Sequence, residues 1–198
     1  LGYQKGFGGH FHNDTALAVL RDIPGLILAC PSDGVDAAMM LRECHRLARE
    51  EQQVVVFLEP IALYPMRDLH ETGDGGWMRT YPAPDQHLAL GDIGVTGDST
   101  DLAIVTYGNG HYLSQQAGKM LEAEGVAPKI IDLRWLLPLP EAALLQALDG
   151  VKHVLIVDET RRTGGIAEGL MSLLYEAGHR HMARVVSEDS FIATGPAY

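Results

Sequence analysis

Residues 26–58 have the sequence LILACPSDGVDAAMMLRECHRLAREEQQVVVFL, and this segment by itself predicts the architecture. It opens with a continuous apolar run from Leu26 to Cys30, which is typical of a strand buried on both faces of a sheet. Behind this run, apolar residues recur at helical spacing: Ala37, Met40, Leu41, Cys44, Leu47 and Ala48. A second apolar strand is predicted at 54–58. Strand, helix and strand in this order predict a right-handed parallel crossover unit.

The same alternation continues on both sides of this unit. A short helix is predicted over 13–22, with Asn13 or Asp14 as its cap and Pro24-Gly25 as its stop. Residues 65–98 are rich in glycine and proline and have little periodicity, which favours a linker between two domains. Beyond the linker we predict strands over 102–107, 129–133, 153–157 and 183–186, and helices over 110–124, 141–148 and 164–177. The sequence therefore predicts an α/β fold with mainly parallel sheets flanked by helices.

Composition excludes several classes of protein. The 198 residues include 15 Lys and Arg against 26 Asp and Glu, so the formal net charge is −11. A chain this acidic repels a phosphate backbone, so we expect no nucleic acid partner. No apolar run reaches the roughly 18–20 residues that a membrane helix needs, so we expect no membrane span. The two cysteines, Cys30 and Cys44, lie in apolar stretches without metal-site spacing, which indicates free thiols and a cytoplasmic location.

Both ends of the chain have the character of internal sequence. The chain starts at Leu1 within a glycine-rich run, and residues 192–198 close it without a helix. We therefore expect a piece of a longer polypeptide.

The densest group of polar side chains is His10-Phe11-His12-Asn13-Asp14, at the start of the first predicted helix. Three interpretations of it compete. The spacing His-x-His-x-Asp is that of a metallo-hydrolase zinc motif, but Thr15 stands where that motif has a further His, and the other histidines are scattered. The imidazoles could instead fill polar corners of a loop. The third interpretation is a catalytic imidazole that a loop delivers at a helix start.

The order of several short motifs supports the third interpretation. His12 stands twelve residues before Pro24 in the segment Ile23-Pro24-Gly25-Leu26, and Val56-Phe57-Leu58-Glu59-Pro60 and Leu63-Tyr64 follow. Further along come Tyr107-Gly108, Ile131-Asp132-Leu133-Arg134, Leu137-Pro138-Leu139, Val157-Asp158-Glu159 and Arg162-Thr163-Gly164-Gly165. In this order the motifs resemble the β subunit, or β-like half, of the thiamine-diphosphate-dependent 2-oxo acid dehydrogenases, which belong to the transketolase-like superfamily. These enzymes are the decarboxylating components of the pyruvate and branched-chain 2-oxo acid complexes.

The resemblance implies a domain organisation. Residues 1–64 would be the C-terminal part of a pyrimidine-binding domain, residues 65–98 a linker, and residues 99–198 a C-terminal domain of the transketolase type. In this family the C-terminal domain serves mainly for assembly, so a homodimer or heterotetramer is expected.

The resemblance also implies a reaction and a cofactor. Thiamine diphosphate, held with Mg²⁺ at the interface with an α subunit or α-like half, decarboxylates a 2-oxo acid and passes the acyl group to the lipoyl group of an acyltransferase component. His12 would transfer protons near the cofactor, a task that suits an imidazole because its unperturbed pKa is about 6.5. The other cofactor-binding residues and the metal ligands are expected outside this chain, so the isolated chain should be inactive.

Some features depart from the family or stay open. Asn13-Asp14 replaces the family's Ser-Gln after its histidine, which puts a carboxylate beside the imidazole, and the family's potassium-binding loop is not matched. A transketolase or deoxyxylulose-phosphate-synthase relative would need more basic residues near His12 than Lys5 and Arg21. A non-catalytic assembly module is a further alternative. The segment 161–165 is expected to form either a tight structural turn or a contact with a ligand or partner.

Overall fold

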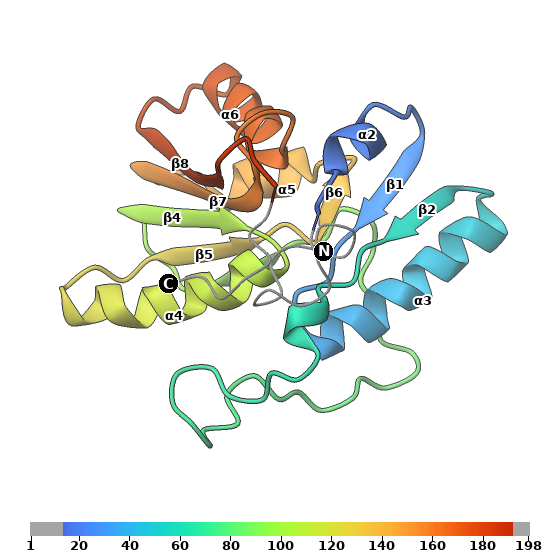
Figure 1. Cartoon of the computed structure of the whole chain (residues 1–198), viewed down its shortest axis with the longest axis horizontal. Coiled ribbons are helices and arrows are strands. Elements are labelled where there is room, and N and C mark those ends of the chain that lie inside the picture. Colours follow the sequence, from blue (N-terminus) through green and yellow to red (C-terminus); the bar gives the residue numbers. More distant parts are fainter. Residues whose placement is uncertain (1–13, 192–198) are drawn as a thin grey trace.

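The computed structural model describes residues 14–191 of the chain (Figure 1). Its elements in chain order are α2 (Leu17–Arg21), β1 (Leu26–Ala29), α3 (Gly34–Glu50), β2 (Val54–Phe57), a 3-10 turn (Ile61–Leu63), β3 (Gly94–Thr96), β4 (Leu102–Thr106), α4 (Asn109–Ala123), β5 (Lys129–Asp132), β6 (Trp135–Leu137), α5 (Glu141–Ala147), β7 (His153–Arg161), α6 (Ile166–Glu176) and β8 (Met182–Ser187). Every helix and strand predicted from the sequence is present, with ends shifted by a few residues. Strands β3 and β6 were not predicted, because three-residue strands are too short to show a period.

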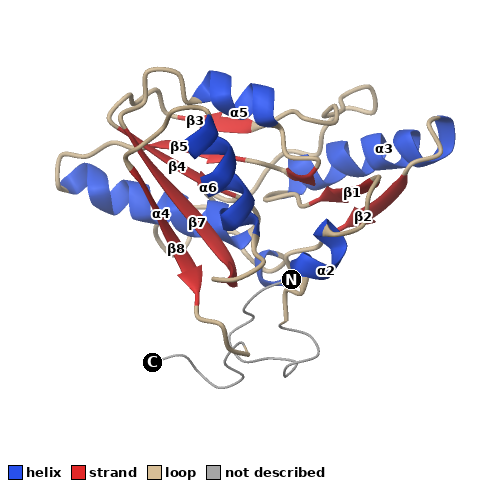
Figure 2. Ribbon diagram, turned by 90° about the horizontal axis from the view of Figure 1, so that it is seen from above, coloured by secondary structure: helices blue, strands red, loops and turns tan. Residues whose placement is uncertain are grey.

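The strands form two sheets (Figure 2). The smaller sheet has the order β2-β1-β6 and the larger has the order β3-β5-β4-β7-β8. Strands β3 and β6 pair antiparallel with their neighbours, and all the other pairs are parallel. Helix α4 covers one face of the larger sheet, while α5 and α6 cover the other. The predicted α/β fold with mainly parallel sheets flanked by helices is therefore confirmed.

Helix α3 shows how local sequence signals place an element. The Asp33 side chain caps its first turn by accepting hydrogen bonds from the N–H groups of Val35 and Asp36, both at 2.9 Å. The apolar face that the helix buries consists of Met40, Cys44 and Leu47. Leu41 and Ala48 were predicted on the same stripe, but Leu41 is 55% exposed and Ala48 is exposed too, so the buried row is narrower than the predicted stripe.

Strand β6 ties the second half of the chain to the first. It follows β5 of the larger sheet, yet it pairs antiparallel with β1, and the N–H of Cys30 donates to the carbonyl of Arg134 at 2.7 Å. Arg134 has a φ of +60°, in the left-handed region, and this conformation turns the chain sharply between the two sheets. The division into residues 1–64, 65–98 and 99–198 stays a prediction, and β6 shows that both outer parts build the smaller sheet.

Buried apolar side chains form two clusters. The larger cluster lies between the larger sheet and helices α5 and α6, and it takes in Leu28 and Cys30 from the first part of the chain. The smaller cluster lies between α3 and β1 and includes Trp135 of β6, which is completely buried. Cys30 and Cys44 are both free and buried, as the sequence predicted. No helix within residues 14–191 combines the length and the apolar character needed to cross a membrane.

Replacing Trp135 tests how far the smaller sheet depends on β6. We expect Trp135→Ala to lower the free energy of unfolding by about 3–5 kcal/mol, because it leaves a cavity between β1 and α3. Met120→Ala, on α4 where the side chain is 73% exposed, should change it by less than about 0.5 kcal/mol. Urea unfolding followed by circular dichroism measures both variants, and equal effects would contradict the role assigned to β6.

Candidate functional site

The residue singled out by the sequence, His12, lies outside the described residues, as does His10. The catalytic role of His12 therefore stays a prediction. The first charged residue after His12 in the sequence is Asp14, so the surroundings of Asp14 and of helix α2 define the first candidate site.

Asp14 is held by an arginine from the far half of the chain. Its Oδ1 lies 2.8 Å from Nη2 of Arg161, the last residue of β7. Arg161 is itself held, because its Nε donates to the carbonyl of Ser190 at 3.0 Å and its guanidinium lies over the ring of Phe191. The prediction of Asn13 or Asp14 as the helix cap is wrong: α2 begins at Leu17, its cap position is Ala16 without a side-chain cap, and the Asp14 carboxylate pairs with Arg161.

Arg21, the last residue of α2, binds the turn between β7 and α6. Nη1 of Arg21 donates to the carbonyl of Gly164 at 3.0 Å and also to the carbonyl of Gly165. Gly164 has a φ of +78°, and a Cβ placed there would lie 2.9 Å from the Cβ of Ala18. Both its backbone conformation and its contact with α2 therefore require glycine. Residues 14–21 are thus fixed at both ends to the turn between β7 and α6.

The turn over 161–165 uses its amide groups within the protein. Three successive N–H groups each have an acceptor at 2.8 or 2.9 Å: those of Arg162, Thr163 and Gly164 donate to Ser187, Asp189 and Glu168 in that order. An anion bound at the start of a helix would need such donors. Of the two alternatives for this segment, the structure therefore favours the tight structural turn.

Asp158 anchors the strand that leads into this turn. Its carboxylate accepts hydrogen bonds from the hydroxyls of Tyr107 at 2.6 Å and Thr160 at 2.7 Å, and from the N–H of Ala167 at 2.8 Å. Burial, together with the nearby carboxylate, raises the pKa of Tyr107 well above its usual value, so the phenol stays protonated as a donor. The motif Val157-Asp158-Glu159 therefore joins β4, β7 and α6 beside the candidate site.

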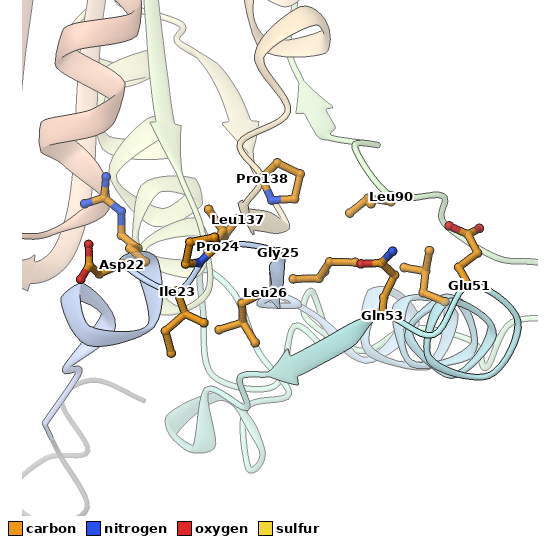
Figure 3. Close-up of a pocket in the computed structure, with 13 residues that line it drawn as sticks. Asp22, Ile23, Pro24, Gly25, Leu26, Glu51, Gln53, Leu90, Leu137 and Pro138 are labelled. Atoms are coloured by element: carbon orange, nitrogen blue, oxygen red, sulfur yellow. The ribbon is translucent and has the colours of Figure 1, made fainter.

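A pocket of about 450 Å³ lies next to α2 (Figure 3). Its walls come from Ile23-Pro24-Gly25-Leu26, from the end of α3 and from Leu137-Pro138. Two of its charged groups already have partners, since Arg21 binds the β7–α6 turn and Glu51 lies 2.7 Å from Arg46. The motif that carries the resemblance thus forms a largely apolar wall where α2, α3 and β6 meet.

A larger pocket of about 600 Å³ opens at the carboxyl ends of β1 and β2. Open α/β sheets bind their ligands at this edge. The pocket has apolar walls that include Phe57 and Trp77, and it contains an ion pair, with Nε of Arg79 3.1 Å from Oδ2 of Asp33. The guanidinium of Arg79 also lies 5.4 Å from the ring centroid of Trp77. An aromatic wall beside an ion pair suits a small amphipathic molecule.

Buried charges lie behind Ser32, which lines this larger pocket. Arg134 binds Asp36 through two hydrogen bonds, from Nε at 2.7 Å and from Nη2 at 2.9 Å. Burial raises the pKa of Asp36 to about 6, although Arg134 opposes this rise. Burial also raises the pKa of Asp132 to about 6, against the hydrogen bond from Ser32. Two carboxyl groups near one arginine therefore titrate not far below neutral pH.

His111, in the first turn of α4, belongs to the same region. Burial lowers its pKa to about 4, although the carboxylates of Asp36 and Asp33 oppose this. Its Nδ1 is buried without a hydrogen-bond partner, and its ring centroid lies 5.8 Å from that of Trp77. The imidazole is therefore neutral at pH 7. The sequence gives no sign that His111 differs from the other scattered histidines. Its burial depends on the ring of Trp77, which lies far away in the sequence and packs near it only in the fold.

Within residues 14–191, no group of three or more His, Cys, Asp or Glu side chains is placed to hold a metal ion. The zinc-hydrolase interpretation of His10 and His12 needs such ligands downstream. It therefore has no support in this part of the chain.

Comparison with known proteins places the chain in a family. Residues 91–197, slightly more than half of the chain, match the family model described as "Transketolase, C-terminal domain". The chain belongs to the transketolase C-terminal domain family. The match begins just before β3 and so takes in the whole larger sheet.

The curated relatives extend the likeness to the smaller sheet. "Pyruvate dehydrogenase E1 component subunit beta" of Acholeplasma laidlawii is 30% identical over 172 residues, which are 86% of this chain and 48% of the relative. "2-oxoisovalerate dehydrogenase subunit beta" of Pseudomonas aeruginosa is 30% identical over 183 residues, 89% of this chain and 50% of the relative. The chain thus spans about half the length of the curated relatives it matches. These relatives confirm the resemblance that the order of the motifs indicated.

A solved structure shows the same fold. "Split gene transketolase, inactive beta4 tetramer" has a TM-score of 0.71 and 24% sequence identity, and the match covers 93% of this chain and 56% of that chain. Since it covers so much of this chain, the match includes both sheets and not the larger one alone.

The buried imidazole provides a pH test of the charge cluster. The folded-state pKa of His111 lies below its unfolded value, so the unfolded chain takes up a proton first as the pH falls, and the fold loses stability between about pH 6.5 and about 4. His111→Phe keeps a ring against Trp77 and cannot titrate. We expect its stability relative to the unchanged protein to rise as the pH falls, by at most about 1.4 kcal/mol per pH unit, in urea unfolding at a series of pH values.

The carboxyl groups of Asp36 and Asp132 act in the opposite direction. Their pKa values are raised in the fold, so the stability they contribute is present at low pH and is lost as the pH rises through about 6. The unchanged protein and His111→Phe both contain these groups, so the difference between them reports the imidazole together with its interaction with Asp36. His45→Gln, on the exposed side of α3, is the matched control and should give a constant difference. A constant difference for His111→Phe as well would show that the imidazole is not the titrating group.

Proposed function

We propose that the chain is the C-terminal part of the β subunit, or β-like half, of a thiamine-diphosphate-dependent 2-oxo acid dehydrogenase. The proposed reaction of the whole enzyme is the oxidative decarboxylation of a 2-oxo acid, with transfer of the acyl group to a lipoyl group. The observation that carries this proposal is the alignment with beta subunits named for pyruvate and 2-oxoisovalerate dehydrogenases over 86% and 89% of this chain. This support does not depend on the C-terminal domain alone.

The proposed domains are the C-terminal part of a pyrimidine-binding domain at residues 1–64, a linker at 65–98 and a transketolase-type domain at 99–198. The family match from residue 91 onward supports the last of these. The parallel pair of β1 and β2 supports a first unit, to whose sheet β6 of the last part adds a strand. Leu28, in the core of the larger sheet, indicates that the two units pack as one body.

The cofactors proposed for the whole enzyme are thiamine diphosphate and Mg²⁺. Residues 14–191 do not fit a metal-bound diphosphate, because they contain no cluster of metal ligands and the β7–α6 turn uses its amide groups within the protein. We therefore assign the main cofactor contacts to polypeptide outside these residues and to an α subunit or α-like half. No catalytic step is assigned to a described side chain.

Within the chain, His12 is proposed to transfer protons during turnover. An imidazole suits this task because it gives and takes a proton near neutral pH. Asp14, two residues later, is proposed as a positioning residue, since its ion pair with Arg161 and the bonds of Arg21 to the β7–α6 turn hold the segment that follows His12. A side chain is oriented best when the backbone beside it is fixed in this way.

The proposed partners are an α subunit or α-like half, the acyltransferase that carries the lipoyl group, and a second copy of the enzyme in a homodimer or heterotetramer. The small-molecule partner is a 2-oxo acid. The free, buried cysteines Cys30 and Cys44 support a reducing, cytoplasmic location.

Activity of the complete enzyme tests the proposal. With its α partner it should reduce an artificial electron acceptor in the presence of pyruvate or a branched-chain 2-oxo acid. His12→Ala should lower kcat by about 10²–10⁴-fold, because proton transfer by a positioned side chain contributes this much. His45→Ala, on the exposed side of α3, should leave kcat unchanged.

Two outcomes of this assay would contradict the proposal. Transfer of two-carbon units between sugar phosphates, without oxidation of a 2-oxo acid, would favour a transketolase or deoxyxylulose-phosphate-synthase relative. A folded complex that turns over neither class of substrate would favour a non-catalytic assembly module.

The 198-residue chain by itself provides a separate test of where the cofactor binds. We expect no saturable rise in its melting temperature when thiamine diphosphate and Mg²⁺ are added, because the main contacts are proposed to lie elsewhere. The complete enzyme, measured in the same way, is the positive control. A large saturable rise for the chain alone would place the cofactor site within it.

A further inference from the structure

Two histidines lie side by side at the amino-terminal edge of the larger sheet. His153 is the first residue of β7, and His181 directly precedes β8. These strands are parallel, and the pairing of Val154 with Met182 puts the two histidines at neighbouring positions. Their ring centroids are 5.5 Å apart, with the planes inclined at 51°.

The backbone fixes both residues. The N–H of His153 donates to the carbonyl of Asp101 at 3.1 Å, and the N–H of Val154 donates to the carbonyl of His181 at 3.0 Å. The two side chains therefore leave the sheet from positions that its hydrogen bonds define. Little conformational freedom of the backbone remains to be lost when the rings bind a common ligand.

The hydrogen bond of the His153 ring determines which nitrogen is available. Its Nδ1 lies 3.0 Å from the carbonyl oxygen of Asp101. A carbonyl oxygen can only accept, so Nδ1 carries the hydrogen and Nε2 presents a lone pair. Histidines that bind metals have this arrangement, in which the second ring nitrogen donates to a carbonyl or a carboxylate.

We propose that His153 and His181 form a binding site for a transition-metal dication such as Zn²⁺, Ni²⁺ or Cu²⁺. Imidazole nitrogens suit these ions, whereas Mg²⁺ and Ca²⁺ prefer oxygen ligands. No third His, Cys, Asp or Glu completes a cluster here among the described residues, so water fills the remaining positions. The site is therefore open and exchangeable, unlike a closed structural zinc site.

The spacing of the rings fits a shared ion. With metal–nitrogen distances of about 2.0–2.1 Å and a tetrahedral angle, two imidazoles on one ion have centroids about 5 Å apart. The observed 5.5 Å is close to this value, so small side-chain rotations bring the nitrogens together. The ammonium group of Lys152 is the positive charge that would repel the ion. Its Nζ lies 2.6 Å from Oδ1 of Asp101, so the carboxylate largely offsets this charge.

The site is distinct from the proposed catalytic segment. His153 and Arg161 stand at opposite ends of the nine-residue strand β7, so they are about 26 Å apart at roughly 3.3 Å per residue. Arg161 contacts Asp14, which comes two residues after His12 in the sequence. A metal at His153 would therefore clamp β7 to β8 and would not enter the reaction.

Calorimetric titration of Zn²⁺ into the purified full chain tests the proposal. We expect saturable binding of about one equivalent that His153→Ala and His181→Ala each weaken at least about tenfold. Mg²⁺ should give no such signal. Zn²⁺ should also raise the melting temperature of the unchanged protein but not of either variant, because it binds the folded state.

Control variants separate this pair from the other histidines. His45→Ala, an exposed histidine on α3, should bind Zn²⁺ as the unchanged protein does, and circular dichroism checks that every variant is folded. In the unchanged protein, NMR should show Zn²⁺-dependent shifts of the imidazole signals of His153 and His181, a measurement that needs no variant. Absence of saturable binding, or binding that His10→Ala or His12→Ala abolishes while His153→Ala does not, would overturn the proposal.

Discussion

Arg134 is the residue on which the rest of the structure depends, because it joins the two halves of the chain in three ways. Its left-handed backbone turns the chain out of the larger sheet. Its carbonyl accepts a hydrogen bond from the N–H of Cys30, and its guanidinium donates two hydrogen bonds to the carboxylate of Asp36 on α3. A left-handed conformation costs a non-glycine residue on the order of 1 kcal/mol. It persists here because the strand pairing and the two hydrogen bonds outweigh that cost.

The same junction explains why titratable groups gather there. Joining two sheets brings Asp36 and Asp132 into one enclosed region, and Arg134 is close to both. Burial dominates over the attraction of the arginine, so both carboxyl groups resist ionisation until the pH approaches 6. His111 shares this surrounding and resists protonation for the same reason. The two kinds of group respond to pH in opposite directions, which gives this fold a pH dependence that no single residue sets.

The proposed catalytic segment depends on a second link between the halves. Arg161 and Arg21 hold residues 14–21 from the two ends, through a carboxylate and through backbone carbonyls of the β7–α6 turn. The turn that the sequence left open as a ligand contact binds Arg21 of α2 through the Gly164 carbonyl, while the Gly164 amide donates to Glu168 of α6. In this arrangement the part of the chain that matches the transketolase C-terminal domain also holds residues 14–21, which follow His12 in the sequence.

Local chemistry in the sequence was sufficient for the alternation of strands and helices and for the buried apolar residues Met40, Cys44 and Leu47 of α3, because these depend on the periods of regular structure. The order of the motifs was sufficient for the family. Only the tertiary structure decided that β6 pairs with β1, that Trp77 covers His111 and that His153 meets His181. Each of these contacts joins residues far apart in the chain. Sequence periodicity carries no signal for such contacts, since pairing and burial are set by how the two sheets pack.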